Sequence, residues 1–449
     1  MYCLLGGYQH NHDIRTGASM TKKILTCFLA SLSISFASCT SSSDPNYAWL
    51  MSLVAGSTAV EAPSGPTDFG IDINDETTPV DFVFDTTRTI TVNVQVIDPI
   101  APVDGSMVQV TVPSATPGAT SSKSVFKAYT NPSGEVTGSF TIDGDTNTVH
   151  LTVEAYGKFY QADISIVNVS KVDRRISVGF TATTTQIIDS DGDGVQDFED
   201  VFPNDPTRVS SIRVPAEDYY TTSFEDLFPK QGDADFNDYV TRSYFEEDLN
   251  KFGEVVRVRG YFTHVAKGAG YNHTLRFGLP GASVTSYSLL RYAADGTTLE
   301  ENLSGTPTSI ADLEILGNSS TTISKSNVSR TDTTFVKGKS AKLEVILSAP
   351  ISKLVLGPAP YDTFIRVINT GKDIHAAGKY FDAEGKDIYR DATGFPWVLL
   401  VPGNFQWPYE ATDIRNSYPT FKTWYESLGT TNTDWFRTPN TSEVFPATP

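Results

Sequence analysis

The sequence feature that most constrains the fold is a series of short segments in which apolar and polar residues alternate. In 88-RTITVNVQVID-98, the apolar positions 90, 92, 94 and 96 are separated by polar ones, which is the period of a β-strand with one buried face. Comparable segments follow at 107–113, 136–142, 148–156, 160–169 and 175–180, with turn residues at 131–135 and 143–147. No helical period interrupts the pattern, so residues 80–182 are predicted to form an antiparallel β-sandwich.

Residues 210–449 carry strand signals over a larger region. Apolar segments of strand length occur at 254–265, 274–280, 341–348 and 363–370. One short amphipathic helix is expected over 419–428, and the proline at its start is compatible with the first turn of a helix. No other helix is expected. The chain is therefore predicted to be mainly β, with an N-terminal immunoglobulin-like β-sandwich and a larger C-terminal domain of the β-sandwich or jelly-roll type.

Composition narrows the range of partners. The 53 acidic residues outnumber the 34 basic residues and give a net charge of −19, which repels nucleic acid and attracts cations. The three cysteines are Cys3, Cys27 and Cys39, so no disulfide framework stabilises the body of the chain. Nucleic-acid binding is excluded, and metal cations are the favoured partners.

The N-terminal segment has the organisation of a secretory signal. From Met20 onward, two lysines precede an apolar run that is too short for a permanent membrane span, and small residues precede Cys39. The small residues followed by cysteine resemble a bacterial lipobox. This resemblance implies that residues 1–38 are a signal peptide starting at Met20, that Cys39 carries palmitate or similar acyl chains as a membrane anchor, and that residues 39–79 form the tether. An ordinary secretory peptide cleaved nearby is the alternative.

An acidic segment over 187–208 follows the predicted sandwich. Counted from Asp189, carboxylates occupy positions 1, 3, 5, 9 and 12, a glycine occupies position 6, and the residue at position 7 supplies a carbonyl oxygen. This is the spacing of a Ca²⁺-binding loop, because the glycine permits a sharp turn around the oxygen ligands. The predicted ligands are Asp189, Asp191, Asp193, Val195, Asp197 and Asp200. The segment lacks the final glutamate and the helical flanks of an EF-hand, and it resembles the thrombospondin type 3 repeats of bacterial envelope proteins. A solvated acidic linker is the alternative.

A second acidic cluster lies in 224-FEDLFPKQGDADFNDYV-240. Acidic residues are interleaved with aromatic and aliphatic ones, so the oxygens are expected on one side of the loop and the rings in a core. Hard oxygen ligands without histidine or cysteine favour Ca²⁺ over Zn²⁺. The predicted ligands are Glu225, Asp226, Asp233, Asp235, Asn237 and Asp238. A run of ordinary caps and turns is the alternative.

The second acidic cluster also resembles the hallmark sequence of the LruC-domain family, FED-L-(W/F)-P followed by GD-x-DFND-x-V. The resemblance continues through 267-KGAGYN-272 and 372-KDIHAAGK-379, and segments at 396–410, 418–427 and 434–436 resemble the domain of unknown function that usually accompanies this family. It covers about residues 210–447. It implies an LruC-type β domain over 210–449 in a lipid-anchored protein of the bacterial outer membrane, facing the periplasm or the cell surface.

The sequence offers no template for catalysis. His264, His273 and His375 lie in the C-terminal region, where they match no known catalytic motif and are interpreted as structural. The four C-terminal tryptophans are expected to fill a core and not a sugar-binding platform. The predicted function is that of a non-catalytic, lipid-anchored envelope protein with a Ca²⁺-stabilised body, which is structural or binds a protein or glycan. The alternative is a Ca²⁺-dependent carbohydrate-binding protein or glycan hydrolase.

Overall fold

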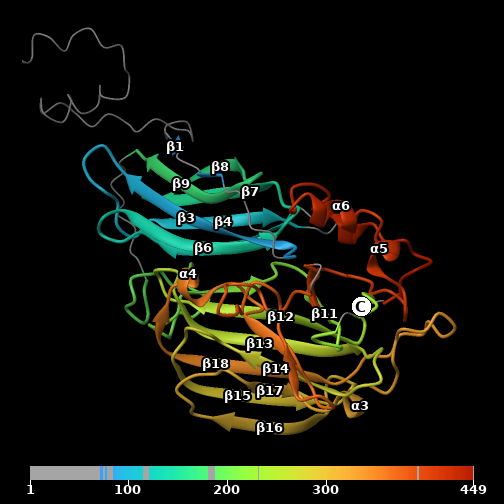
Figure 1. Cartoon of the computed structure of the whole chain (residues 1–449). Coiled ribbons are helices and arrows are strands. Elements are labelled where there is room, and N and C mark those ends of the chain that lie inside the picture. The colour runs from blue at the N-terminus through green and yellow to red at the C-terminus, as the bar shows by residue number, and fades with distance from the viewer. Residues whose placement is uncertain are drawn as a thin grey trace, which may run out of the picture. The chain divides into compact units, whose positions relative to one another are not determined.

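The computed structural model describes residues 71–73, 76–77, 84–114, 121–179, 188–230, 232–391 and 394–447 (Figure 1). All of these belong to one compact unit, Gly65–Pro449. The predicted signal peptide, Cys39 and most of the tether lie outside the described residues. Strands account for 44% and helices for 6%, which confirms the mainly β prediction. No helix within the described part of the chain is long and apolar enough to cross a lipid bilayer.

Two sheets form a β-sandwich in the N-terminal part of this unit. One has the strand order β1–β9–β3–β6, with β2 beside β9, and the other has the order β5–β4–β7–β8. The strands are β1 (Ile71–Ile73), β2 (Glu76–Thr77), β3 (Thr87–Ile97), β4 (Met107–Pro113), β5 (Ser122–Tyr129), β6 (Glu135–Asp143), β7 (Thr148–Ala155), β8 (Lys158–Ser165) and β9 (Val169–Ser177). The alternating apolar residues of β3 are buried in the core that the two sheets share, as their period predicts.

Two features of this sandwich differ from the expectation. Strand β3 pairs with β9 in parallel, although an antiparallel sandwich is predicted. Strand β5 is absent from the prediction because Val125 and Phe126 are consecutive and both buried, which breaks the period of two. A register shift between Val110 and Thr111 of β4 accommodates this pair, since a bulge changes which side a residue faces.

Two further sheets enclose the C-terminal core. An eight-stranded sheet has the order β16–β15–β18–β13–β12–β11–β21, with β10 beside β12, and a four-stranded sheet has the order β17–β14–β19–β20. The larger sheet contains β10 (Ser210–Val214), β11 (Tyr220–Phe224), β12 (Tyr239–Leu249), β13 (Val255–Ala266), β15 (Val284–Tyr292), β16 (Leu299–Gly305), β18 (Ser340–Ile351) and β21 (Val398–Pro402). The smaller contains β14 (His273–Gly278), β17 (Leu313–Leu316), β19 (Asp362–Val367) and β20 (Lys372–Ile374). Phe245 and Phe262 of the larger sheet pack against Phe277 of the smaller, so both sheets share one core.

Five short helical segments occur in the described part of the chain: α3 (Ser319–Thr322), α4 (Lys353–Leu356), α5 (Ile414–Ser417), α6 (Phe421–Glu426) and η2 (Trp435–Arg437). Helix α6 confirms the helix predicted over 419–428. The expectation of a single helix is wrong, because the other four have only three or four residues and are too short to show a helical period. The four C-terminal tryptophans, Trp397, Trp407, Trp424 and Trp435, are buried, which confirms that they fill a core.

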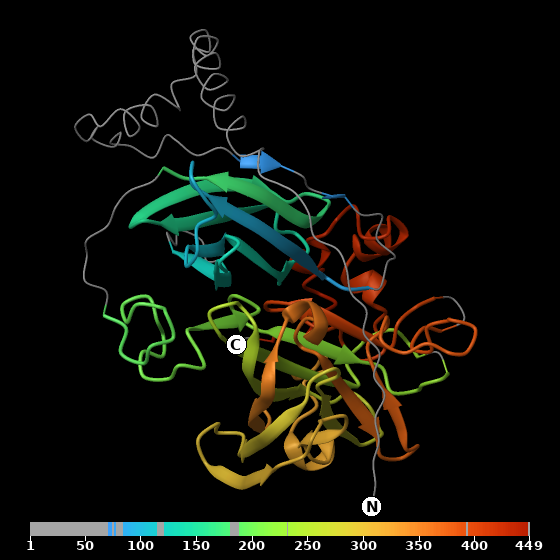
Figure 2. The same ribbon diagram turned by 90° about the vertical axis from the view of Figure 1, so that its left-hand side faces the viewer.

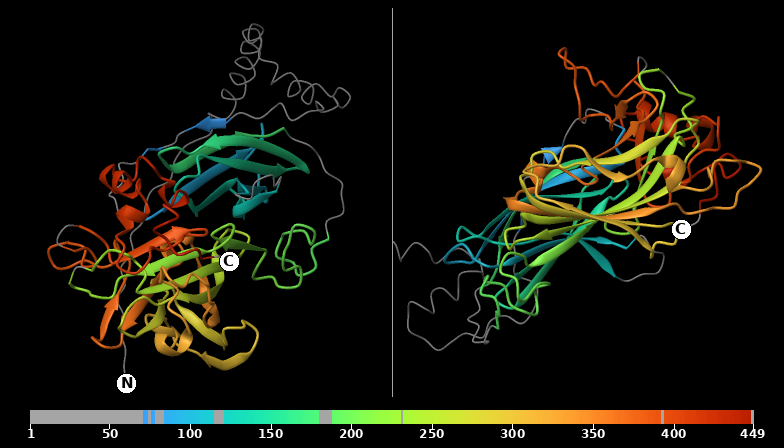
Figure 3. Two further views of the ribbon diagram at one scale, coloured as in Figure 1. Left: turned by 90° about the vertical axis from the view of Figure 1, so that its right-hand side faces the viewer. Right: turned by 90° about the horizontal axis from the view of Figure 1, so that it is seen from below.

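The fold positions the two acidic segments differently. Segment 188–209 contains neither helix nor strand and is drawn as a coil in Figure 2 and in the left panel of Figure 3. The second acidic loop, residues 225–238, connects two neighbouring strands, because Phe224 of β11 lies opposite Tyr239 of β12. On its other edge, β11 pairs with β21, with Phe224 opposite Val398. The chain that leads into β21 therefore lies beside the second loop, whereas the chain that follows Pro402 leaves from the opposite end of β11, next to Tyr220.

Two candidate cation sites

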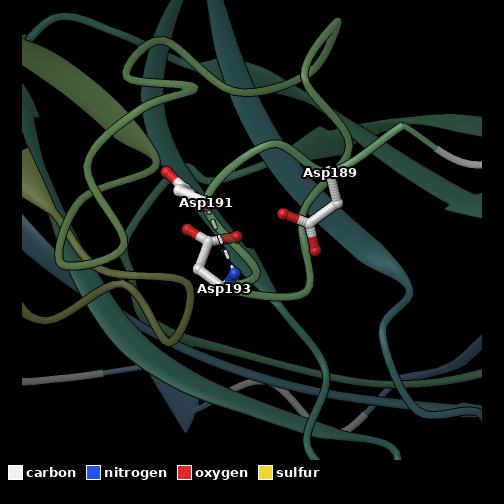
Figure 4. A group of neighbouring side chains, drawn as sticks. All are labelled: Asp189, Asp191 and Asp193. Carbon is white, nitrogen blue, oxygen red and sulfur yellow. Dashed lines mark hydrogen bonds between the residues drawn. The ribbon is translucent and has the colours of Figure 1, made fainter.

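The first acidic segment is shaped by hydrogen bonds from its own backbone. The Asp189 carboxylate accepts from the N–H groups of Gly192 and Gly194, at 2.7 and 3.0 Å. Asp191 Oδ1 accepts from the N–H of Asp193 at 3.2 Å, the bond marked by the dashed line in Figure 4. Both glycines have positive φ, 81° and 95°, a backbone that glycine adopts without steric cost. The predicted sharp turn is therefore present.

Three carboxylates meet in this turn. Oxygens of Asp189, Asp191 and Asp193 lie within 4.8 Å of one another. Asp191 Oδ2, Asp193 Oδ2 and Asp200 Oδ2 are buried and have no hydrogen-bond partner among the described residues. Burial, reinforced by neighbouring carboxylates, raises the pKa of Asp193 and of Asp200. A buried oxygen without a partner costs about 1–3 kcal/mol, and a cation would remove that cost.

The other two predicted ligands of this segment have different surroundings. Asp197 accepts hydrogen bonds from the N–H and the O–H of Ser190, at 2.7 and 2.6 Å. These bonds tie the two ends of the turn together, and Asp197 is not one of the three converging carboxylates. Val195 is buried in a small apolar cluster with Met107 and Tyr129, which anchors the turn through its side chain.

The second acidic loop buries most of its polar side chains. Glu225, Asp226, Asp235 and Asn237 are each at most 3% exposed, whereas Asp233 is exposed. The rings of Phe224, Phe236 and Tyr239 are fully buried, which confirms that the aromatic residues anchor the loop in a core. Buried charges are costly unless they are paired or bind a metal ion. This loop therefore needs compensation that its own side chains do not supply.

Backbone hydrogen bonds compensate only some of the oxygens in the second loop. Glu225 Oε1 accepts from the N–H of Phe236 at 2.6 Å. Asp235 Oδ1 accepts from the N–H of Asn237 at 3.2 Å, and Asp235 Oδ2 accepts from the N–H of Ala411 at 2.8 Å. Glu225 Oε2 and Asn237 Oδ1 are buried without a partner in the described structure.

Oxygens of Glu225, Asp233 and Asp235 lie within 4.8 Å of one another. Glu225 and Asp233, together with Gly232, line a cavity of about 190 Å³, which has room for an ion and water. Burial, followed by the charge of Asp233, raises the pKa of Asp235 to about 7. Burial and nearby carboxylates also raise the pKa values of Glu225 and Asp238. A cation would stabilise the ionised forms of these buried carboxylates, because an opposite charge nearby favours the charged form.

Two glycines make room for the unpartnered oxygens. A Cβ atom at Gly232 would lie 1.9 Å from Glu225 Oε2. A Cβ atom at Gly268 would lie 1.9 Å from Asn237 Oδ1 and 2.8 Å from Glu410 Oε2. Only glycine permits such a close approach. Gly268 and Glu410 are missing from the predicted ligand set, and their only sequence signal is their place in the segments that carry the family resemblance.

The C-terminal histidines have structural partners. His264 Nδ1 accepts from the O–H of Thr322 at 2.7 Å, and its Nε2–H donates to the carbonyl of Ala266 at 2.9 Å. His273 Nε2–H donates to Asp226 Oδ2 at 2.9 Å, and it orients a predicted ligand. His375 Nδ1–H donates to Asp362 at 2.9 Å. His264, His273 and His375 therefore each have the hydrogen-bond partner that a structural role predicts.

The donor atoms of both loops are carboxylate, amide and carbonyl oxygens. Ca²⁺ takes six to eight such oxygens at about 2.3–2.6 Å, so the residues present fit this ion. Fold and loops together define a mainly β protein with two carboxylate-lined loops, one before strand β10 and one between strands β11 and β12.

Part of this chain matches a known protein family. Residues 253–436, which are less than half of the chain, match the family described as "Domain of unknown function (DUF4842)". This confirms the expectation of a domain of unknown function in the C-terminal region. Both acidic segments precede the matched residues, whereas Gly268 and Glu410 lie within them. A search of curated proteins found no significant match.

Comparison with solved structures identifies a similar fold. A crystal structure of a "putative lipoprotein" from Bacteroides ovatus superposes with a TM-score of 0.50 at 15% sequence identity, over 75% of this chain and 98% of that chain. At this identity the similarity concerns the fold alone. A 9R-lipoxygenase from Cyanothece reaches a TM-score of only 0.15 at 8% identity, over 52% of this chain and 44% of that chain.

Proposed function

We propose that this protein is a lipid-anchored, non-catalytic component of the bacterial outer envelope, with a β-rich body that is stabilised by Ca²⁺ and serves a structural or binding role. In this proposal, a thrombospondin type 3-like loop over 187–208 and an LruC-type domain over 210–449 each hold calcium. The observation that carries it is the set of buried carboxylate and amide oxygens in the two acidic loops that have no hydrogen-bond partner among the described residues. A cation would satisfy these oxygens and remove their mutual repulsion.

The position of the first loop supports a structural role. This loop is held from two sides, because Lys127 Nζ donates to the carbonyl of Glu199 and Lys251 Nζ donates to the carbonyl of Asp193, both at 2.8 Å. Lys127 belongs to strand β5 of the sandwich, whereas Lys251 follows strand β12 of the C-terminal sheet. An ion that stiffens this loop would stabilise the connection between the two regions.

The anchor part of the proposal has separate support. The order of basic residues, apolar run, small residues and Cys39 is that of an exported, lipidated chain, and the Bacteroides ovatus protein of similar fold is described as a putative lipoprotein. Acyl chains on Cys39 would attach the body to the outer membrane.

Thermal unfolding tests the calcium part. Full-length protein in detergent should unfold at a higher temperature in Ca²⁺ than in chelator, because a ligand that binds only the folded state contributes about 2.7 kcal/mol at a hundredfold excess over Kd. Mg²⁺ at equal concentration is the control and should stabilise less, since it loses its water reluctantly. Identical unfolding in Ca²⁺ and chelator would refute calcium binding. A glycan array probed with and without chelator would detect the carbohydrate-binding alternative.

A further inference from the structure

We propose that Glu410 and Asn237 are ligands of the cation in the second acidic loop, so that this ion fastens the C-terminal segment 404–447 to the loop. The inference rests on the proposed calcium binding and deepens it, because it makes the docking of one part of the chain depend on the ion.

The orientation of Asn237 is the first argument. This side chain is completely buried, and its Nδ2 donates to the carbonyl of Pro408 at 3.1 Å. A flipped amide would place two oxygens against each other, so the hydrogen bond determines which way the amide points. Asn237 Oδ1 is left without a partner among the residues described. A buried amide oxygen held in this way is either a costly defect or a ligand.

The position of Glu410 is the second argument. Asn237 Oδ1 and Glu410 Oε2 lie 1.9 and 2.8 Å from the same point, the place where a Cβ atom of Gly268 would stand. Two oxygens that bind one Ca²⁺ at about 2.3–2.6 Å lie within about 5 Å of each other, and this pair meets that condition. Partial burial, followed by the charges of Asp233 and Asp226, raises the pKa of Glu410, so its carboxylate belongs to the same group of acids.

The backbone next to Glu410 is already bonded to the second loop. Ala411 N–H donates to Asp235 Oδ2, and Ile414 N–H donates to the carbonyl of Ala234, both at 2.8 Å. With the Asn237–Pro408 bond, three contacts connect residues 408–414 to residues 234–237. Two of them use the side chains of predicted ligands. A movement that separates these ligands would therefore also break hydrogen bonds to the C-terminal segment.

The segment that would be fastened carries much of an aromatic core. Trp407, Tyr418 and Trp435 are fully buried, and they belong to the cluster that also contains Phe236 of the second loop. Without the ion, the carboxylates of Asp235 and Glu410 repel each other, and Asn237 Oδ1 has no partner among the described residues. The ion would turn this repulsion into attraction, and Ca²⁺ should therefore order residues 404–447.

Glu410→Gln tests the inference, because Glu410 is exposed and its loss should not prevent folding. The substitution is made in full-length protein carrying Asp191→Asn and Asp193→Asn, which removes the first site. The matched control is Glu426→Gln, an exposed glutamate of helix α6. Calorimetric titration with CaCl₂ should show at least about tenfold weaker binding for Glu410→Gln, since affinity follows the number of charged ligands, and no change for Glu426→Gln. Hydrogen exchange should show that Ca²⁺ protects residues 404–447 less in Glu410→Gln than in the control.

The outcomes separate this inference from the calcium proposal. If Glu410→Gln and the control bind Ca²⁺ equally and are protected equally, Glu410 is not a ligand, although the second loop still binds calcium. If the parent with its second loop intact binds no Ca²⁺, both the calcium proposal for this loop and the inference are refuted. The inference is supported if only Glu410→Gln binds Ca²⁺ more weakly and if its residues 404–447 are less protected from hydrogen exchange than those of the control in calcium but not in chelator.

Discussion

Replacing Asp235 with asparagine should change the stability of the protein in opposite directions with and without calcium. Asp235 is 1% exposed, and burial followed by the charge of Asp233 raises its pKa from 3.8 to about 7. A folded-state pKa above the unfolded value means that the protonated side chain favours folding below about pH 4 and that this contribution is lost as the pH rises through about 7. At pH 8 without calcium, the ionised side chain therefore destabilises the fold by an amount on the order of 4 kcal/mol.

Asparagine removes that charge but keeps only one hydrogen-bond acceptor. Asp235 Oδ1 and Oδ2 accept from the N–H groups of Asn237 and Ala411, and an amide side chain cannot accept at both atoms. The lost bond costs about 1–2 kcal/mol. In chelator at pH 8, Asp235→Asn should thus be more stable than the wild type by about 2 kcal/mol. In calcium it should be less stable, because the wild type gains about 2.7 kcal/mol at a hundredfold excess over Kd and the variant loses most of this gain.

The assay is thermal unfolding of the full-length protein at pH 8 in CaCl₂ and in chelator. Asp104→Asn is the control, because Asp104 is exposed in the turn after strand β3 and the substitution changes the net charge equally. Its unfolding temperature should respond to calcium as the wild type does. If Asp235→Asn lowers the unfolding temperature equally in both solutions, Asp235 acts as an ordinary turn residue, and the reasoning about this loop is refuted.

Three further predictions concern other parts of the chain. Cys39→Ala should leave the protein exported but soluble, or unprocessed, in a detergent-partition assay; full partition with normal processing would contradict the anchor. Calcium should protect residues 185–210 from limited proteolysis, and Asp191→Asn should abolish this protection, whereas equal cleavage in chelator would exclude calcium from the first loop. Asp143 has a pKa raised to about 6 by burial and by Asp145, so its protonated form favours folding at low pH and this contribution is lost as the pH rises through 6. Asp143→Asn should raise stability by about 1 kcal/mol at pH 8, a value reduced for solvent screening, and have little effect at pH 4; an equal gain at both pH values would show that charge is not the cause.

The sequence by itself determined the features that depend on neighbouring residues. The alternation in 88–98 identifies strand β3, and the segment 107–113 coincides with strand β4, because the side chains of a strand alternate whatever the strand pairs with. The turn of the first acidic loop is also local. Asp189 is bonded to Gly192 and Gly194, three and five positions away, so the spacing of aspartate and glycine was enough to identify it.

Only the tertiary structure decided which distant residues meet. The bulge at Val125 of β5 and the parallel pairing of β3 with β9 depend on the partner strands. The alternation of apolar and polar residues in the sequence does not reveal either of them. Spacing also did not show that Asp197, a predicted ligand of the first loop, accepts hydrogen bonds from Ser190. Glu410 is 173 positions from Asn237 in the sequence. The two side chains meet because Asn237 is bonded to the carbonyl of Pro408 and because Gly268 leaves space between their oxygens. Residues that are distant in the sequence become neighbours through packing, so their spacing along the chain does not predict that they meet.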